Sequence, residues 1–271
     1  MRKKTVPKEI KSLKTVFIYA GIVLFFVFVS FAIKTFFVIQ HSKYDGQHTF
    51  TIVIAKNHKV GELIAFNPST PSFSLLHIVS GDVPLVSYGK LLAVAADGTV
   101  DSNEDIPYGT KVTTTMLYLL LHFNSIKTNL TLYDIGRLLL LSKNVSETDK
   151  KIKDIQLPVE DIEQDKINTS LFTDDTLSSE NTSIQIINAT DMPGIGKRLE
   201  RVITNIGGNV VAVSTAQTKE NVSKIQSSNN ETYTIKKLKN LFKFPVTKPD
   251  NPAVGNITII IGEDNVNTSA F

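Results

Sequence analysis

The chain of 271 residues contains no cysteine and no tryptophan. Without cysteine it can form no disulfide framework, thiol nucleophile, zinc ribbon or iron–sulfur cluster. Its length favours one or two domains rather than a large multidomain enzyme.

The net positive charge of the chain belongs entirely to its first fourteen residues. Residues 1–14 contain six Lys or Arg and one Glu, whereas the whole chain has a formal charge of only +3. The sequence pI of about 8.8 would suggest nucleic-acid binding, but the excess of positive charge belongs to this short tail. We therefore expect no nucleic-acid partner for the nearly neutral remainder of the chain.

A long apolar run follows the basic tail. Residues 16–33 contain no charge, and after Lys34 the apolar character continues over 36–39. A helix needs about 20 residues to cross the hydrocarbon core, and a lysine near its end can extend to the interface. A signal peptide would have an apolar region of only about 7–15 residues and a small-residue cleavage site. The sequence therefore predicts one uncleaved transmembrane helix over residues 15–39.

The distribution of basic residues predicts the orientation of this helix. Six basic residues precede it, whereas only Lys34 and Lys43 lie at or just after its end. Basic residues that flank a membrane helix stay on the cytoplasmic side, and the membrane potential also favours that side for positive charge. We expect residues 1–14 to be a cytoplasmic tail and the bulk of the chain to lie outside the cell membrane.

The chain after the apolar run divides into three segments that differ in amino-acid composition. Residues 48–157 mix apolar runs with turn signals and predict an α+β domain. Residues 158–183 contain seven acids against Lys166, with few large apolar residues, and predict a flexible linker. Residues 184–264 regain a regular pattern and predict a second, smaller domain.

The pattern of the last segment predicts the order βαββαβ, a split βαβ arrangement with both helices on one face of a sheet. The expected strands lie at 183–187, 210–213, 222–227 and 257–261, and the expected helices at 193–206 and 231–243. In the earlier domain we expect strands at 50–54, 61–66 and 73–78, and helices at 110–122 and 131–142.

Residues 184–196 (IQIINATDMPGIG), 207–211 (GGNVV) and 257–262 (ITIIIG) resemble the LytR C-terminal domain. That family opens with a strand, an Asn-Gly-Thr-like turn and a Pro-Gly helix start. It ends in an Ile/Val-rich strand with Gly. Ala189 replaces the usual Gly of the turn. The resemblance covers about residues 183–264.

The upstream domain is similar to the LytR–CpsA–Psr family at residues 65–68 (AFNP), 75–78 (LLHI) and 128–132 (TNLTL). Active members of that family are phosphotransferases. They attach polyprenyl-pyrophosphate-linked glycopolymers to the cell wall and use clustered arginines and a divalent metal. Here the family's Ile-Pro-Arg-Asp is replaced by residues 78–82 (IVSGD). The resemblance therefore implies a degenerate domain over 48–157.

Arginine is the residue that a pyrophosphate clamp needs most, because its planar fork binds two oxygens at once. Outside the tail the chain contains only Arg137, Arg198 and Arg201, and the last two belong to the C-terminal segment. We therefore expect no catalytic site, no metal and no cofactor. The alternative is a magnesium-dependent phosphotransferase whose side chains Asp82, Lys90 and Arg137 converge.

The leading interpretation is a membrane-anchored, extracytoplasmic cell-envelope protein that binds cell-wall polymer or an envelope protein partner. Its candidate polymer-binding residues are four lysines on the last expected helix. They are Lys236, Lys237, Lys239 and Lys243. The alternative interpretation is that these lysines form one solvated face of an amphipathic helix.

The orientation can be tested with a protease added to intact cells whose wall has been removed. We expect the protease to digest the chain beyond about residue 40, because the basic tail holds only the N-terminus inside. Full protection of residues 45–271 until the membrane is permeabilised would contradict this orientation.

Overall fold

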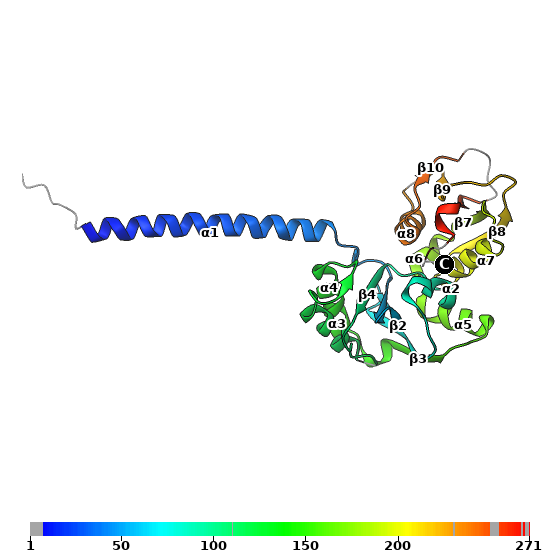
Figure 1. Ribbon diagram of the computed structural model, residues 1–271, viewed down its shortest axis with the longest axis horizontal. Helices are drawn as coiled ribbons and strands as arrows, with labels where there is room; N and C mark the ends of the chain where they lie inside the picture. The colour runs from blue at the N-terminus through cyan, green and yellow to red at the C-terminus, as the bar shows by residue number, and fades with distance from the viewer. Residues whose placement is uncertain (1–7, 110, 230, 250–254, 267, 269–270) are drawn as a thin grey trace, which may run out of the picture. The chain divides into compact units, whose positions relative to one another are not determined.

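The computed structural model describes residues 8–109, 111–229, 231–249, 255–266, 268 and 271. The chain divides into two compact units, Met1–Ser42 and Lys43–Phe271. The first contains one helix, and the second contains two β-sheets and the remaining helices (Figure 1). This mixture of helices and sheets confirms the predicted α+β class.

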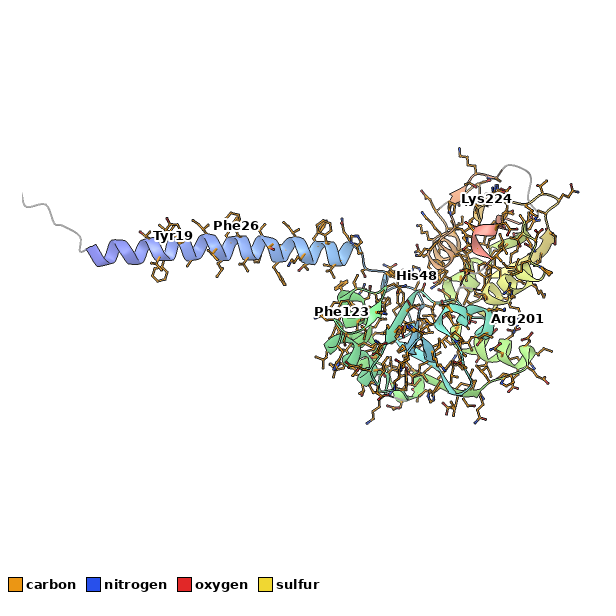
Figure 2. All side chains as sticks on the ribbon, viewed as in Figure 1. Tyr19, Phe26, His48, Phe123, Arg201 and Lys224 are labelled. Carbon is orange, nitrogen blue, oxygen red and sulfur yellow. The ribbon has the colours of Figure 1, made fainter. Side chains whose placement is uncertain are left out.

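The first unit consists of the helix α1 (Lys8–Gln40). Its segment Thr15–Gln40, 26 residues long, has a mean hydropathy of 2.7 and is not buried within the protein. At 1.5 Å per residue this segment extends about 39 Å, which exceeds the roughly 30 Å of a hydrocarbon core. Figure 2 shows Tyr19 and Phe26 pointing away from the helix. The predicted apolar helix is confirmed, and it is long and apolar enough to cross a membrane.

The first sheet of the second unit has the strand order β5-β4-β1-β2-β3-β6. Strands β1, β2 and β3 form an antiparallel meander, while β4 and β6 join its two sides in parallel. The three strands expected from the sequence are the three of the meander. The bounds are β1 (Phe50–Lys56), β2 (Lys59–Asn67), β3 (Ser72–Ser80), β4 (Gly98–Ser102), β5 (Lys127–Thr128) and β6 (Lys150–Gln156).

Both faces of this sheet are buried, because its central strands are apolar on both sides. Ile52 and Ile64 belong to the core beneath α3 and α4, whereas Val53 and Leu63 belong to the core on the opposite face. The helices α2 and α5 contribute to that opposite core. The bounds are α2 (Tyr88–Leu92), α3 (Val112–Leu121), α4 (Leu132–Lys143) and α5 (Asp161–Phe172), with short 3₁₀ turns η1 (Leu85–Ser87) and η2 (Glu147–Asp149).

The acidic segment 158–183 is not the flexible linker that its composition predicts. It forms α5 and α6 (Asp175–Glu180), and three of its large apolar residues are buried in cores, although Ile162 is exposed. Leu171 and Phe172 are buried against the first sheet, and Leu177 is buried in the core of the second. The prediction of an unstructured linker was wrong because these three side chains are enough to fix two short helices between larger elements.

Polar side chains of the same segment are also bound in the interior. Gln164 and Asn168 donate hydrogen bonds to the carbonyls of Leu91 and Leu92 at 3.0 and 2.6 Å. These carbonyls end α2, where a helix leaves its last acceptors without partners. The segment therefore satisfies polar groups of the first domain instead of avoiding contact with it.

The second sheet has the order β10-β9-β11-β7-β8 and confirms the predicted βαββαβ order, with the short edge strand β10 added. Leu199 of α7 and Leu238 of α8 share one core with Ile186 and Ile259, so both helices cover the same face. The bounds are β7 (Ser183–Asn188), α7 (Ile195–Asn205), β8 (Asn209–Thr215), β9 (Lys224–Ser227), α8 (Tyr233–Phe242), β10 (Val246–Thr247), β11 (Ile257–Ile261) and η3 (Glu263–Asn265).

A buried charge cluster joins the two sheets. The ammonium group of Lys237 donates to the carbonyl of Thr49 at 2.7 Å and to the carboxylate of Asp97 at 3.0 Å. It lies 3.6 Å from the carboxylate of Asp174, and the three charged side chains are at most 10% exposed. The hydroxyl of Tyr233 also donates to Asp174. This cluster ties α8 to the start of β1, to the loop before β4 and to the start of α6.

Lys237 is therefore not one of the solvated lysines that the sequence predicts. It lies three residues after Thr234 and four before Leu241, both of which are buried, so it belongs to the inward stripe of α8. The sequence did not predict the inward orientation of Lys237, because it lies in a lysine-rich helix whose other lysines, Lys236, Lys239 and Lys243, are exposed. Lys237 is thus unavailable for binding a polymer.

We expect Lys237→Met to lower the free energy of unfolding by about 3 kcal/mol, because it leaves two buried carboxylates without their cation. The matched control Lys236→Met removes an exposed lysine from the next position and should change stability by at most about 0.5 kcal/mol. Urea unfolding of the detergent-solubilised chain, followed by circular dichroism, measures both changes. Equal midpoints for the two variants would show that the cluster does not stabilise the fold.

Candidate binding cleft

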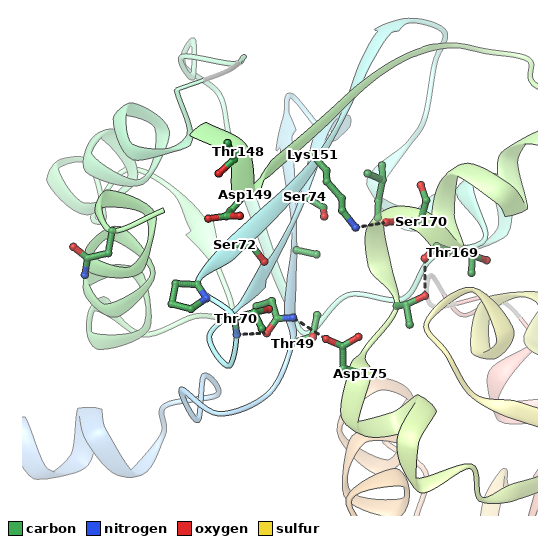
Figure 3. A pocket seen from close by; sticks show the side chains of 16 residues that line it. Thr49, Thr70, Ser72, Ser74, Thr148, Asp149, Lys151, Thr169, Ser170 and Asp175 are labelled. Carbon is green, nitrogen blue, oxygen red and sulfur yellow. Dashed lines mark hydrogen bonds between the residues drawn. The ribbon is translucent and has the colours of Figure 1, made fainter. Parts of the chain in front are cut away.

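A cleft of about 780 Å³ lies on the face of the first sheet that α5 covers. Ala65 of β2, Ser74 of β3 and Lys151 of β6 form its floor. Figure 3 shows Ser74 and Lys151 on neighbouring strands. Strand pairing sets them side by side, because Ser74 is the register partner of both Ala65 and Lys151. The alternation of β3 directs Ser74 to this face, while Phe73 and Leu75 enter the opposite core.

The end of α5 and the start of α6 form the facing wall. The ammonium group of Lys151 donates to the carbonyl of Ser170 at 3.4 Å. The amide of Asn67 donates to Asp175 at 3.1 Å, which joins the turn after β2 to α6. These two bonds connect the floor and the wall at separate points along the cleft (Figure 3).

Hydroxyl and amide side chains dominate the lining. Only Asp149, Lys151 and Asp175 carry charge, and none of the sixteen lining residues is aromatic or a histidine. The hydroxyl and amide residues are Thr49, Asn67, Thr70, Ser72, Ser74, Asn144, Thr148, Thr169, Ser170 and Thr173. Such a surface both donates and accepts hydrogen bonds, and no lining serine or threonine has a histidine base beside it. The arrangement is suited to binding a polar ligand.

The sequence did not predict this cleft. Its residues come from six elements (β2, β3, η2, β6, α5 and α6) and from the loops beside them, so no single stretch of the chain shows them together. The available signal was weak, consisting of Ser72 and Ser74 alternating with apolar residues along one strand. Such alternation is equally typical of a strand with one solvated face.

The first sheet also contains a buried acidic side chain, Glu62. Glu62 of β2 is fully buried, and burial raises the pKa of its carboxyl group from its usual 4.5 to about 7. The backbone N–H of Gly109 donates to one carboxyl oxygen, and the other has no hydrogen-bond partner among the described residues. The hydroxyl of Tyr108 is also buried without one, and burial raises its pKa to about 12. A lone acid within the apolar strand 61–66 was the sequence signal for this site.

The residues of the phosphotransferase alternative are held by different partners. Asp82 forms an exposed ion pair with Lys59 at 3.3 Å. Arg137 donates to the backbone carbonyls of Tyr44 and Asp45 at 2.7 and 3.1 Å. Lys90 is exposed on α2. No hydrogen bond or ion pair between described residues joins any two of these three side chains.

Of the four lysines proposed to bind polymer, three are exposed on α8 and its C-cap. Lys236 and Lys239 lie on the helix, and Lys243 adopts the left-handed conformation that ends it. Burial and the charge of Lys243 together lower the pKa of Lys43, which places these two cations near each other.

Comparison with known proteins identifies the second sheet. Residues 181–264 match the family model described as LytR cell envelope-related transcriptional attenuator. The chain carries a LytR C-terminal domain. The match begins before β7 and ends in η3, so this LytR C-terminal domain contains the whole second sheet with α7 and α8. Together with the apolar helix α1, the LytR C-terminal domain fits a cell-envelope protein.

The solved structure of the transcriptional regulator YvhJ from Bacillus subtilis is similar to part of the chain. Sequence identity is 9% and the TM-score is 0.30, and the similarity covers 40% of this chain and 83% of the YvhJ chain. No curated protein sequence matches the chain.

The raised pKa of Glu62 predicts a pH dependence of stability. The folded chain keeps a proton on Glu62 between about pH 4.5 and pH 7, where the unfolded chain has released it. Rising pH therefore favours unfolding in this window, by roughly 3 kcal/mol in total. We expect Glu62→Gln to remove this loss and to be more stable than the parent at pH 8, because it stays neutral and can still accept from Gly109.

Urea unfolding at a series of pH values between 4 and 8 measures this effect. Glu163→Gln is the control, because it removes an exposed acid from α5 and should leave the slope unchanged. A parent protein whose stability rises through this window, or a Glu62→Gln variant with the parent slope, would contradict the assignment.

Proposed function

We propose that the chain is a membrane-anchored, extracytoplasmic protein that binds a cell-wall glycopolymer in the cleft between the first sheet and α5. The observation that carries this proposal is the lining of the cleft by ten hydroxyl and amide side chains. Its volume of about 780 Å³ falls within the roughly 300–1,000 Å³ that is typical of ligand sites.

The chemistry of the lining favours a sugar polymer over an apolar ligand. Hydroxyl and amide groups exchange hydrogen bonds with sugar hydroxyls and N-acetyl groups, because both sides donate and accept. Asp149 and Asp175 can bind amino groups, and Lys151 can bind a phosphate or carboxylate. A mixed set of charges therefore suits a polymer whose units alternate in charge or carry both signs.

The anchor and the orientation support the same function. The basic residues before the apolar segment favour a cytoplasmic N-terminus, which exports the cleft to the side where wall polymer lies. The LytR C-terminal domain supports a place in the cell envelope. The exposed lysines Lys236, Lys239 and Lys243 provide a second, salt-sensitive contact for anionic parts of the polymer.

Among the described residues, no contact brings together the side chains that the phosphotransferase alternative requires. The guanidinium of Arg137 is engaged by two backbone carbonyls, and Asp82 is engaged by Lys59. These contacts stabilise the first domain and are not directed at a shared ligand. Magnesium-dependent cleavage of a polyprenyl-pyrophosphate glycan by the purified chain would overturn the binding proposal in favour of the enzyme.

We expect Ser74→Trp to weaken binding of purified wall glycopolymer at least about tenfold, which corresponds to about 1.4 kcal/mol. The large ring would fill the floor of the cleft, where Ser74 lies between Ala65 and Lys151. Co-sedimentation of the detergent-solubilised chain with the polymer measures the change in affinity.

Ser80→Trp is the matched control, because it places the same ring at the exposed end of the same strand, outside the cleft. It should bind as the parent does. If both variants bind equally well while raised salt releases the polymer, the lysines of α8 and not the cleft would be the binding site.

A further inference from the structure

The chain becomes fixed to α4 almost as soon as α1 has ended. The backbone N–H groups of Lys43 and Tyr44 both donate to one carboxylate oxygen of Asp134 at 3.0 Å. Arg137, one turn further along α4, donates to the carbonyls of Tyr44 and Asp45. These four bonds attach residues 43–45 to the first two turns of α4.

Gly46 permits this close attachment. Its φ of +80° lies in the left-handed region, and a Cβ atom there would stand 1.8 Å from a guanidinium nitrogen of Arg137. A residue with a side chain would therefore displace the guanidinium. Residues 43–46 therefore pack closely against α4. The guanidinium group of Arg137 also lies over the ring of Tyr44, 4.8 Å from its centroid.

The attachment limits the distance between α4 and the anchor. Helix α1 ends at Gln40, and its apolar residues continue to Ile39. The three peptide steps from Gln40 to Lys43 can extend at most about 11 Å, at roughly 3.6 Å per residue. Lys43 therefore lies within about 11 Å of Gln40 along the chain, and its backbone N–H is hydrogen-bonded to Asp134 in the first turn of α4.

The outward face of α3 and α4 is apolar. Both helices already bury one face in the core, yet Leu121 is 72% exposed and Leu140 is 61% exposed. The hydroxyl of Thr113 donates to the carbonyl of Ser142, so the start of α3 lies beside the end of α4 and the helices are antiparallel neighbours (Figure 1). The exposed large apolar residues of this outer face are Leu117, Leu121, Leu132, Tyr133 and Leu140.

We propose that this outer face of α3 and α4 rests on the lipid bilayer, with its leucines entering the headgroup region of the outer leaflet. The proposal rests on the membrane anchor of the proposed function, since the anchor brings α4 within reach of the surface. It goes beyond that function, because it assigns a second contact with lipid to the exported domain.

The composition of the face suits a bilayer better than a second protein chain. Tyr133 joins an apolar ring to a polar hydroxyl, which is the combination that favours the membrane–water interface. Lys143 follows Leu140 by three residues on the same side of α4 and can extend to lipid phosphates. Helices that lie in the interface share this pattern of a leucine-rich face with cations at its margin.

Single cysteines provide a direct test, because the chain has none of its own. Leu121→Cys and Leu140→Cys in the full chain are each labelled with an environment-sensitive fluorophore and reconstituted into phospholipid vesicles that contain nitroxide-labelled lipid. Ile162→Cys is the matched control, since Ile162 is equally exposed but lies on α5, which covers the opposite face of the first sheet. Phe26→Cys reports on the anchor itself.

We expect the probes at residues 121 and 140 to shift to shorter wavelength and to lose most of their emission to the nitroxide lipid, while the probe at 162 does neither. The proposal would be overturned if the probes at residues 121 and 140 emitted at the same wavelength as the probe at 162 and were not quenched. If the probe at residue 26 were quenched in the same sample, the anchor would remain supported. An unquenched probe at residue 26 would overturn the anchor as well. A blue shift without lipid quenching that disappears when the chain is diluted into more vesicle lipid would show a second copy on this face and overturn the proposal.

Discussion

The buried ammonium group of Lys237 is the constraint on which the arrangement of residues 43–271 depends. Two carboxylates, Asp97 in the loop before β4 and Asp174 at the start of α6, are each nearly inaccessible to water. Charges buried in this way are costly unless each finds a partner. The lysine of α8 is their shared cation, so the LytR C-terminal domain completes the electrostatics of the domain before it.

The same junction explains why the acidic segment is ordered. Asp174 accepts the N–H groups of Thr176 and Leu177 and so begins α6, while Glu180 at the end of α6 accepts from Thr234. Both of these acids therefore have defined donors, which hold the two ends of α6 in place. The helices α5 and α6 shape the wall of the cleft, so the polar site exists because the segment is folded.

Sequence periodicity was sufficient for the elements that bury a regular stripe. The strands of the first meander, the helices α3 and α4, and the whole βαββαβ order followed from the spacing of apolar residues. It failed for β6, whose sequence KKIKDIQ carries the charges that protect an edge strand. It also failed for β4, where Val100 is the one large apolar residue in five.

The candidate site was less predictable than the fold, for a physical reason. Its floor is made by strand register, which aligns Ser74 with Lys151 across more than seventy residues of chain. Hydroxyl residues give no periodic signal that separates a binding surface from a wet face. The prediction that Lys237 is solvated failed for a different reason. The exposed lysines Lys236, Lys239 and Lys243 around it concealed its inward position on α8.

The shared cation also bears on how such a chain can change in evolution. Transfer of residues 181–264 alone into another protein would separate Lys237 from Asp97 and Asp174. The remaining chain would then hold two buried carboxylates without their cation. Gene fusion at the boundary of the LytR C-terminal domain would therefore carry a penalty at both ends. The segment from β1 to β11 is better regarded as one heritable block than as two exchangeable modules.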